Sequence, residues 1–166
     1  VEAQYRFWNE TLRPELTAAG VRILARDSWN AKQKRWLHKH FQDEILPVLS
    51  PIGLDPAHPF PRILNKSLNV MVVLEGRDAF GRRGGMAIIR APRSLPRIIH
   101  LPPDIADGPH DFVLLSAVLT AFVDEQFTGM KVKGAYQFRV TRNSELFVDE
   151  EEVENLAHAL KDELAS

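Results

Sequence analysis

Arginine side chains are the groups in this sequence most able to do chemistry. Six of them fall between residues 77 and 97, where the only acid is Asp78, and two more follow at Arg139 and Arg142. The six are Arg77, Arg82, Arg83, Arg90, Arg93 and Arg97. Because a guanidinium fork matches phosphate oxygens, the pattern predicts a basic groove for a polyanion, there or beside Arg139 and Arg142. The alternative is a set of hydrated strands whose arginines bind nothing.

The run Gly81 to Gly85 could form a small anion-binding nest with Arg82 and Arg83. It lacks the lysine and the strand-to-helix setting of a nucleotide-binding loop, and no Gly-x-x-x-x-Gly-Lys run occurs elsewhere in the chain. An ordinary hairpin loop explains the same glycines. The sequence therefore predicts no nucleotide site.

Other reactive residues give no recognisable constellation. His38 and His40 are two residues apart in a predicted helix and so point to different sides, and the other four histidines are isolated. The acids at 149–152 could attract magnesium, but they also suit the start of a helix. Cysteine is absent, which excludes thiolate chemistry and disulfides. We expect no catalytic residue, no metal site and no bound cofactor in this chain.

Composition indicates one ordinary folded domain. The chain has 166 residues, 45% of them hydrophobic and 26% charged, with a formal net charge of -1. Such a balanced charge argues against a general nucleic-acid binder. No apolar stretch approaches the roughly 20 residues of a membrane-spanning helix. The first residues include neither Met nor a signal-like stretch, so we expect a piece cut from a longer protein.

The first half of the chain alternates helical and extended patterns. Apolar spacing predicts a helix over residues 2–18, interrupted or restarted near Pro14, and the apolar run 21–24 predicts a strand. A second helix follows, capped by Asp27 or Ser28 and stopped by Pro47. Five prolines between 47 and 61 then predict an ordered, non-helical connector that packs against the fold. We expect no domain boundary there.

The second half is richer in strands. Residues 67–74 and 86–89 predict a hairpin, residues 97–101 an edge strand, and residues 111–127 a buried helix. Residues 135–142 alternate as in a half-buried strand, with Tyr136 on the apolar side and Arg139 on the polar side. An amphipathic helix is predicted at the end, with Val153, Leu156, Ala157, Leu160 and Leu164 on one face. Together these elements predict an α+β fold with a mainly antiparallel sheet and packed helices.

Three stretches resemble bacterial polyphosphate kinase of the long, multidomain class, and they occur in that family's order. The first runs from Leu46 to Val70 and includes the Asp-Pro-x-His-Pro-Phe-Pro pattern at 55–61, followed by Asn65, Ser67 and Asn69. The second is Ser94-Leu95-Pro96-Arg97, and the third is Phe138-Arg139-Val140-Thr141-Arg142-Asn143 with the acidic run beyond it. Glu145 stands where the family usually has aspartate. The resemblance covers nearly the whole chain.

The resemblance implies that residues 1–166 form the middle or head domain, including the helical segment at about 1–18, without the catalytic domains. The parent enzyme would reversibly transfer the terminal phosphate of ATP to polyphosphate through a phosphohistidine. Magnesium and ATP would be held by the absent domains, and none of the six histidines here matches the phosphoacceptor. The fold would be similar to that of small phosphohistidine phosphatases. This fragment is expected to be inactive alone.

The resemblance also implies partners for this domain: the other domains of the kinase, further copies in a homo-oligomer, and polyphosphate itself. The parent is expected in the cytoplasm, with peripheral association at the membrane as a variant of that expectation. Arg139 and Arg142 are the first candidates for contact with polyphosphate. Arg82, Arg83, Arg90, Arg93 and Arg97 form a second set. The alternatives are a stand-alone binding or oligomerisation module and a phosphohistidine-phosphatase-like enzyme.

Overall fold

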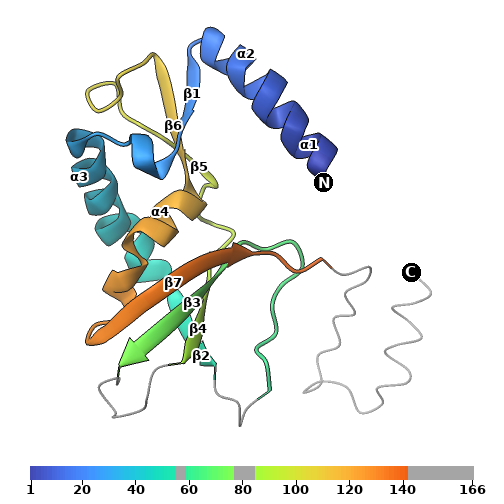
Figure 1. Cartoon of the computed structure of the whole chain (residues 1–166). Coiled ribbons are helices and arrows are strands. Elements are labelled where there is room, and N and C mark those ends of the chain that lie inside the picture. The colour runs from blue at the N-terminus through green and yellow to red at the C-terminus, as the bar shows by residue number, and fades with distance from the viewer. Residues whose placement is uncertain (55–58, 77–84, 142–166) are drawn as a thin grey trace.

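The computed structural model describes residues 1–54, 59–76 and 85–141. Within them, two sheets and three helices form an α+β fold, and one of the sheets is entirely antiparallel (Figure 1). The predicted fold class is confirmed to that extent. The final helix predicted around 149–164 lies outside the described residues.

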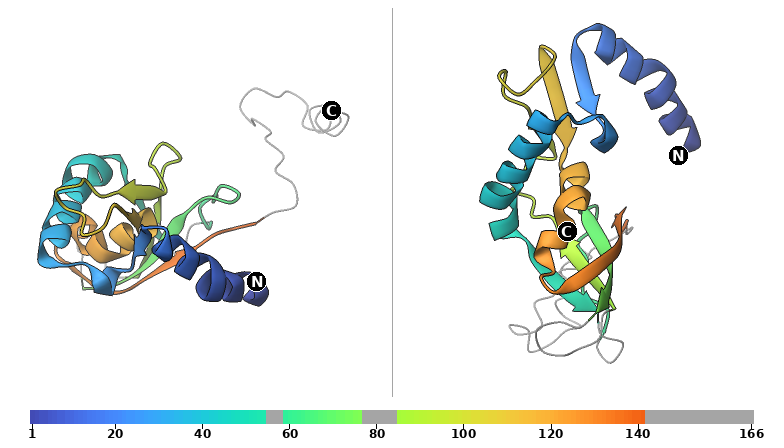
Figure 2. Two further views of the ribbon diagram at one scale, coloured as in Figure 1. Left: turned by 90° about the horizontal axis from the view of Figure 1, so that it is seen from above. Right: turned by 60° about the vertical axis from the view of Figure 1, so that its left-hand side comes forward.

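The N-terminal helix stands away from the rest of the molecule. It consists of α1 (Glu2–Phe7), a π-helical turn (Trp8–Leu12) and α2 (Arg13–Ala18), which confirms the helix predicted over 2–18. Pro14 lies in the first turn of α2, where a missing N–H is tolerated, so the helix continues through it. None of its residues is buried, and two further views show it projecting from the body (Figure 2).

The smaller sheet has the order β1-β6-β5. β1 (Val21–Leu24) runs parallel to β6 (His110–Leu114), and β5 (Ile98–His100) pairs with β6 in the antiparallel sense. The strands predicted at 21–24 and 97–101 are therefore confirmed, the latter at an edge. The parallel pair also means that the prediction of mainly antiparallel strands describes the larger sheet better than the smaller one.

The helix predicted over 111–127 is wrong in its first part. The segment begins as β6, and α4 (Leu115–Phe122) starts only afterwards, followed by a 3-10 turn (Val123–Gln126). The apolar run is continuous across this junction, and a strand buried on both faces has the same composition as a buried helix. The backbone of Leu114 is extended, with φ -74° and ψ 135°, and marks the change.

The larger sheet has the order β2-β4-β3-β7, and all its pairs are antiparallel. β3 (Asn69–Gly76) and β4 (Met86–Arg90) form the predicted hairpin. β7 (Met130–Phe138) begins and ends earlier than the predicted strand at 135–142. β2 (Ser50–Leu54) lies within the proline-rich connector, where no strand was predicted. Pro51 is tolerated because β2 is an edge strand, which leaves one side of its backbone without a ladder partner.

The second helix starts later than predicted. α3 (Ala31–His40) is capped by Asn30, and neither Asp27 nor Ser28 takes that role, because they lie in a short 3-10 turn (Arg26–Ser28) before it. The Asn30 side chain accepts a hydrogen bond from Gln33 N at 2.9 Å, and Gln33 Oε1 accepts one from Asn30 N at 3.1 Å. This reciprocal arrangement is a capping box. The helix continues through a π-helical turn (Phe41–Ile45) into a 3-10 turn (Leu46–Val48) at Pro47.

Replacing Asn30 with alanine is expected to lower the free energy of unfolding by about 1–2 kcal/mol, because the first turn of α3 loses its cap. Asn30 Nδ2 also donates to Asp107 Oδ2 at 3.0 Å, so the loop before β6 loses a contact as well. Urea unfolding followed by circular dichroism measures the change. Asn9→Ala, the same substitution on the exposed N-terminal helix, serves as the control and should change the midpoint little.

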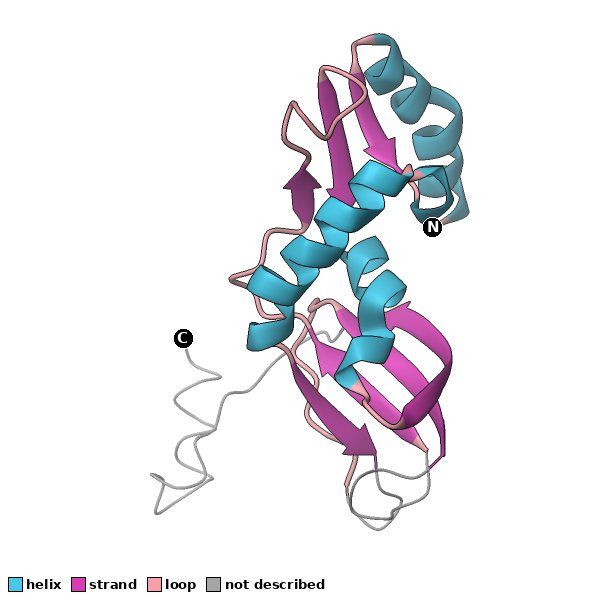
Figure 3. Ribbon diagram, turned by 90° about the vertical axis from the view of Figure 1, so that its left-hand side faces the viewer, coloured by secondary structure: helices cyan, strands magenta, loops and turns pink. Residues whose placement is uncertain are grey.

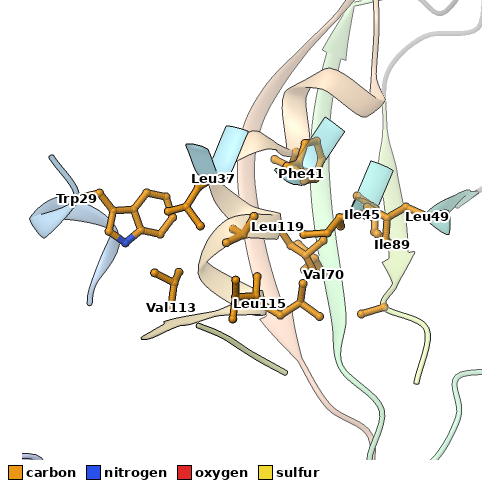
Figure 4. Packing of buried hydrophobic residues seen from close by; sticks show 14 of the residues in the cluster. Trp29, Leu37, Phe41, Ile45, Leu49, Val70, Ile89, Val113, Leu115 and Leu119 are labelled. Carbon is orange, nitrogen blue, oxygen red and sulfur yellow. The ribbon is translucent and has the colours of Figure 1, made fainter. Parts of the chain in front are cut away.

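The hydrophobic core joins both sheets through α3 and α4. Side chains from each of these elements are buried together; they include Trp29, Leu37, Phe41, Ile45, Val70, Ile89, Val113, Leu115 and Leu119 (Figure 4). Both helices lie on one side of the larger sheet (Figure 3). In the described part of the chain, no helix has the length and apolar character needed to cross a membrane.

Candidate functional site

A row of four aligned residues crosses one end of the larger sheet. Ser50 of β2 pairs with Arg90 of β4, Arg90 pairs with Asn69 of β3, and Asn69 pairs with Phe138 of β7. Residues directly opposite each other in antiparallel strands share a face, so Arg90 lies between Ser50 and Asn69 on the same side of the sheet. The chain leaves β4 immediately after Arg90 and enters the loop that carries Arg93 and Arg97.

A pocket of about 280 Å³ opens at this end of the sheet. Arg90 and Arg93 line it, together with Val48, Ser50, Leu64, Ser67, Ala91 and Pro92. Both arginines are exposed, so their guanidinium groups are available to a ligand from solvent. Among the lining residues in the described part of the chain there is no acid. The pocket therefore combines two permanent positive charges, two hydroxyl groups and apolar walls.

Backbone hydrogen bonds fix the loop that carries Arg93, both at its two ends and within it. Ala91 N donates to Leu68 O at 3.0 Å, Leu95 N donates to Pro92 O at 3.2 Å, and Leu115 N donates to Arg97 O at 2.9 Å. The Arg97 guanidinium donates back to Ala91 O at 3.4 Å. Arg97 thus fastens the loop and lies beside a pocket residue, while Arg93 remains at the pocket wall.

Two buried polar residues at this end of the larger sheet, Ser67 and Asn69, were not predicted as site residues. Ser67 is almost fully buried, and its hydroxyl donates to Leu64 O at 2.7 Å. Asn69 is buried, and its Nδ2 donates to both Ser67 O and Ser67 Oγ at 3.0 Å. Among the residues that the structure describes, Asn69 Oδ1 has no hydrogen-bond partner. Ser67 thus lines the pocket, and Asn69, which pairs with Arg90 in the sheet, holds Ser67. Only their place in the family-like stretch at 46–70 drew attention to them.

The other predicted arginines divide into two groups. Arg139 is exposed and comes one residue after the Phe138 end of the row, and Val140 O, next along the chain, accepts a hydrogen bond from Lys66 N at 2.8 Å. Strand alternation directs the Arg139 side chain to the face opposite Phe138 and Arg90, so it shares the end of the sheet but not the pocket. Arg82, Arg83 and Arg142 lie outside the described residues.

Phosphate oxygens are the chemistry that this arrangement suits. Two guanidinium groups and a hydroxyl-bearing rim can hold a tetrahedral oxyanion, but the pocket contains no side chain able to act as general base or nucleophile beside an activating partner. In the described ranges, no three His, Asp or Glu side chains gather as metal ligands, so these residues do not fit a magnesium site. The arrangement suits the binding of an anion.

The histidines in the described residues have structural neighbours. His38 bonds to Glu125, which also accepts from Gln42 Nε2 at 2.9 Å, and His40 stacks on Trp36 with ring centroids 5.1 Å apart. His40 and Glu44 also line a second pocket of about 390 Å³, together with apolar residues that include Ile45, Ile99 and Leu115. His38 thus ties α3 to the turn after α4.

Residues 32–166 match the sequence model of a protein family, the polyphosphate kinase middle domain. The chain belongs to the polyphosphate kinase family. It is 65% identical over 167 residues to the polyphosphate kinase of Xylella fastidiosa strain 9a5c, and 56% identical over 166 residues to that of Pseudomonas aeruginosa. Each alignment covers 100% of this chain but only 24% of the relative. The chain therefore spans about a quarter of these polyphosphate kinases.

A solved structure agrees in fold. The crystal structure of polyphosphate kinase from Porphyromonas gingivalis superposes with a TM-score of 0.77 at 26% sequence identity, over 89% of this chain and 23% of that one. The fold described above is thus the fold of a polyphosphate kinase middle domain. The family predicted from the three sequence stretches is confirmed. The likeness to phosphohistidine phosphatases stays a prediction.

Proposed function

We propose that this middle domain serves a polyphosphate kinase as a non-catalytic scaffold with a basic wall for polyphosphate. The whole enzyme would reversibly move the terminal phosphate of ATP onto polyphosphate through a phosphohistidine carried by another domain. Magnesium and ATP would likewise be held elsewhere, and this domain would contribute subunit contacts. The observation that carries the proposal is the meeting of Arg90 and Arg93 at one pocket without a lining acid in the described residues.

The charge of the pocket supports this role better than the charge of the whole chain. A net charge of -1 gives no long-range attraction for a polyanion, so any affinity must be local. Guanidinium groups remain charged at all physiological pH values and hold phosphate oxygens in pairs. Polyphosphate presents such oxygens on every unit of its chain. Arg139, at the same end of the sheet but on the other face, would then contact a different part of the polymer.

Replacing Arg90 and Arg93 together with alanine in the intact kinase is expected to weaken polyphosphate binding at least about tenfold at low salt, because each charged hydrogen bond contributes roughly 1.5–3 kcal/mol. The loss should be smaller at high salt, where screening already weakens the wild-type contact. Equilibrium binding of polyphosphate at two ionic strengths measures both effects. The matched control is Arg6→Ala with Arg13→Ala, which removes the same charge from the projecting helix.

A second variant, Arg139→Ala with Arg142→Ala, removes the two arginines that the sequence favours most and should show the same salt dependence. Of these two, Arg139 tests the other face of the sheet. Unchanged affinity of the Arg90/Arg93 variant at both salt concentrations, with circular dichroism like that of the wild type, would remove the pocket from the proposal. A loss equal to that of the control pair would show only a general effect of net charge.

A further inference from the structure

The second pocket shares no lining residue with the pocket of Arg90 and Arg93, which we call the arginine pocket. It opens where the C-terminal end of α3, the loop from β4 to β5 and the start of α4 come together. Figure 3 shows that loop passing beside the end of α3. A volume of about 390 Å³ is enough for a small organic molecule. The residues that line the pocket are His40, Glu44, Ile45, Ser94, Leu95, Pro96, Ile99 and Leu115.

The apolar part of the lining belongs to the hydrophobic core. Ile45, Ile99 and Leu115 are buried, and they come from the helical turn after α3, from β5 and from α4. All three belong to the core cluster, and Leu95 packs against it. Because the core packing holds these side chains in place, the apolar wall exists before a ligand arrives. Such a wall stabilises the ring or hydrocarbon part of a ligand by removing it from water.

Glu44 gives the second pocket a negative charge. It is exposed, and within the described ranges no hydrogen bond or ion pair engages its carboxylate. Asp43, the neighbouring acid, differs because it pairs with Lys39 at 2.5 Å. Among the lining residues that the structure describes there is no Lys or Arg. The Glu44 carboxylate is therefore open to a positively charged ligand.

The positive groups of the loop from β4 to β5 are used elsewhere. Arg93 comes just before Ser94 but lines the arginine pocket, and the Arg97 guanidinium donates to Ala91 O at 3.4 Å. Leu115 N, the first N–H of α4, donates to Arg97 O at 2.9 Å, so this N–H is not offered to an anion. The end of the helical run that begins with α3 brings the negative end of a helix dipole to the second pocket. This pocket thus favours a cation, whereas the arginine pocket favours an anion.

His40 and Ser94 add hydrogen-bond acceptors to the lining. His40 and Glu44 are four residues apart on one helical run, so their side chains are neighbours. The His40 ring is stacked on that of Trp36, with an angle of 7° between the ring planes, and this contact holds it in place. A neutral imidazole nitrogen and a serine hydroxyl can each accept a hydrogen bond from an N–H group. Together with the Glu44 carboxylate they can serve all the N–H donors of a primary ammonium group.

We propose that the second pocket binds a small organic amine, whose ring or hydrocarbon part packs against Ile45, Ile99 and Leu115 and whose ammonium group pairs with Glu44. An anion of the same shape binds less well, because it meets the Glu44 carboxylate and finds no cation in the lining. An amine without an apolar part also binds less well, because it leaves the apolar wall in water. The inference is independent of polyphosphate binding by the arginine pocket.

Tryptamine and indole-3-acetate test the charge preference, because they carry the same ring with opposite charges at neutral pH. Each is titrated into the whole chain, and two-dimensional NMR follows the backbone amides. We expect tryptamine to bind at least about tenfold more tightly than indole-3-acetate, as one charged hydrogen bond implies. The largest shifts should fall on Ser94, Leu95 and Ile99. Butylamine, which has the charge without the ring, should bind at least about tenfold more weakly than tryptamine.

Two substitutions at the end of α3 identify the group responsible for the preference. Glu44→Gln should bring the affinity for tryptamine to within about twofold of that for indole-3-acetate, whereas Asp43→Asn, which removes the neighbouring carboxylate, should keep the preference. Both positions are exposed, so both variants should fold. A preference that survives in Glu44→Gln, or equal affinities of the wild type for the two indoles, would overturn the proposal. Undetectable binding of tryptamine, or shifts confined to residues outside the pocket, would overturn it as well.

Discussion

Replacing Phe41 with alanine is expected to lower the free energy of unfolding by about 3–5 kcal/mol, a large part of the 5–15 kcal/mol typical of a domain. Phe41 is fully buried, and its ring lies 5.6 Å from that of Phe122 of α4, centroid to centroid. It stands in the turn after α3, within the cluster that includes side chains of both sheets. Removing the ring leaves a cavity where these elements meet.

Urea unfolding, followed by circular dichroism, measures this effect if the variant folds. Phe41→Leu keeps most of the volume and is expected to cost less than about 1.5 kcal/mol, so the series stays informative if the alanine variant does not fold. Phe60→Ala is the matched control, since Phe60 is 60% exposed on the connector. A Phe41→Ala midpoint as close to the wild type as that of Phe60→Ala would contradict the central place of Phe41 in the core.

Local signals predicted the β3–β4 hairpin and the edge strand β5 well. The β3–β4 hairpin follows from two apolar runs on either side of a glycine-rich segment, and β5 follows from a short run between prolines. The N-terminal helix was also predictable from its spacing. In each case the information lies within a few residues, so no knowledge of the partner element was needed.

Three features required the tertiary structure. The β6–α4 junction lies in one apolar run, and the pairing of β6 with β1 and with β5 decides where the strand ends, because its last residue, Leu114, pairs with Ile98. β2 is a strand because β4 offers it an open edge, which proline content cannot reveal. The cap at Asn30 had a local signal, an Asn three residues before a Gln, but the acid and serine just before it were equally good candidates.

The candidate site was predicted as a region, not as a pocket. Clustered arginines indicated a basic surface, yet the sequence could not say that Arg90 and Arg93 face one pocket while Arg97 fastens the loop. Strand pairing decides this, because Arg90 faces Ser50 and Asn69 across two neighbouring strands. Arg139 was ranked above these residues, whereas the structure places it beyond the end of β7 and off the pocket.

Arg22→Ala is expected to lower the free energy of unfolding by about 3 kcal/mol, near the lower end of the range for a broken buried ion pair. Arg22 Nε and Nη2 each donate to the Asp111 carboxylate at 2.6 Å and join β1 to β6. Asp111 is buried, whereas the Arg22 side chain is 36% exposed, so water can partly replace the lost guanidinium. Lys39→Ala, which removes an exposed pair with Asp43, is the control and should leave the unfolding midpoint nearly unchanged.

The pH dependence of the stability lost in Arg22→Ala shows whether the loss comes from the ion pair with Asp111. The Arg22 guanidinium, with the N–H groups of Asp107 and Gly108, lowers the pKa of Asp111 from 3.8 to about 2. A carboxyl group whose pKa falls on folding stabilises the fold above its unfolded pKa and loses that contribution as it becomes protonated. The difference in unfolding midpoint between wild type and Arg22→Ala should therefore be full above about pH 4 and shrink as the pH falls toward 2. A difference that stayed constant from pH 7 to pH 2 would mean that Arg22 acts through packing of its aliphatic stem, and that its charge contributes little to the junction of β1 and β6.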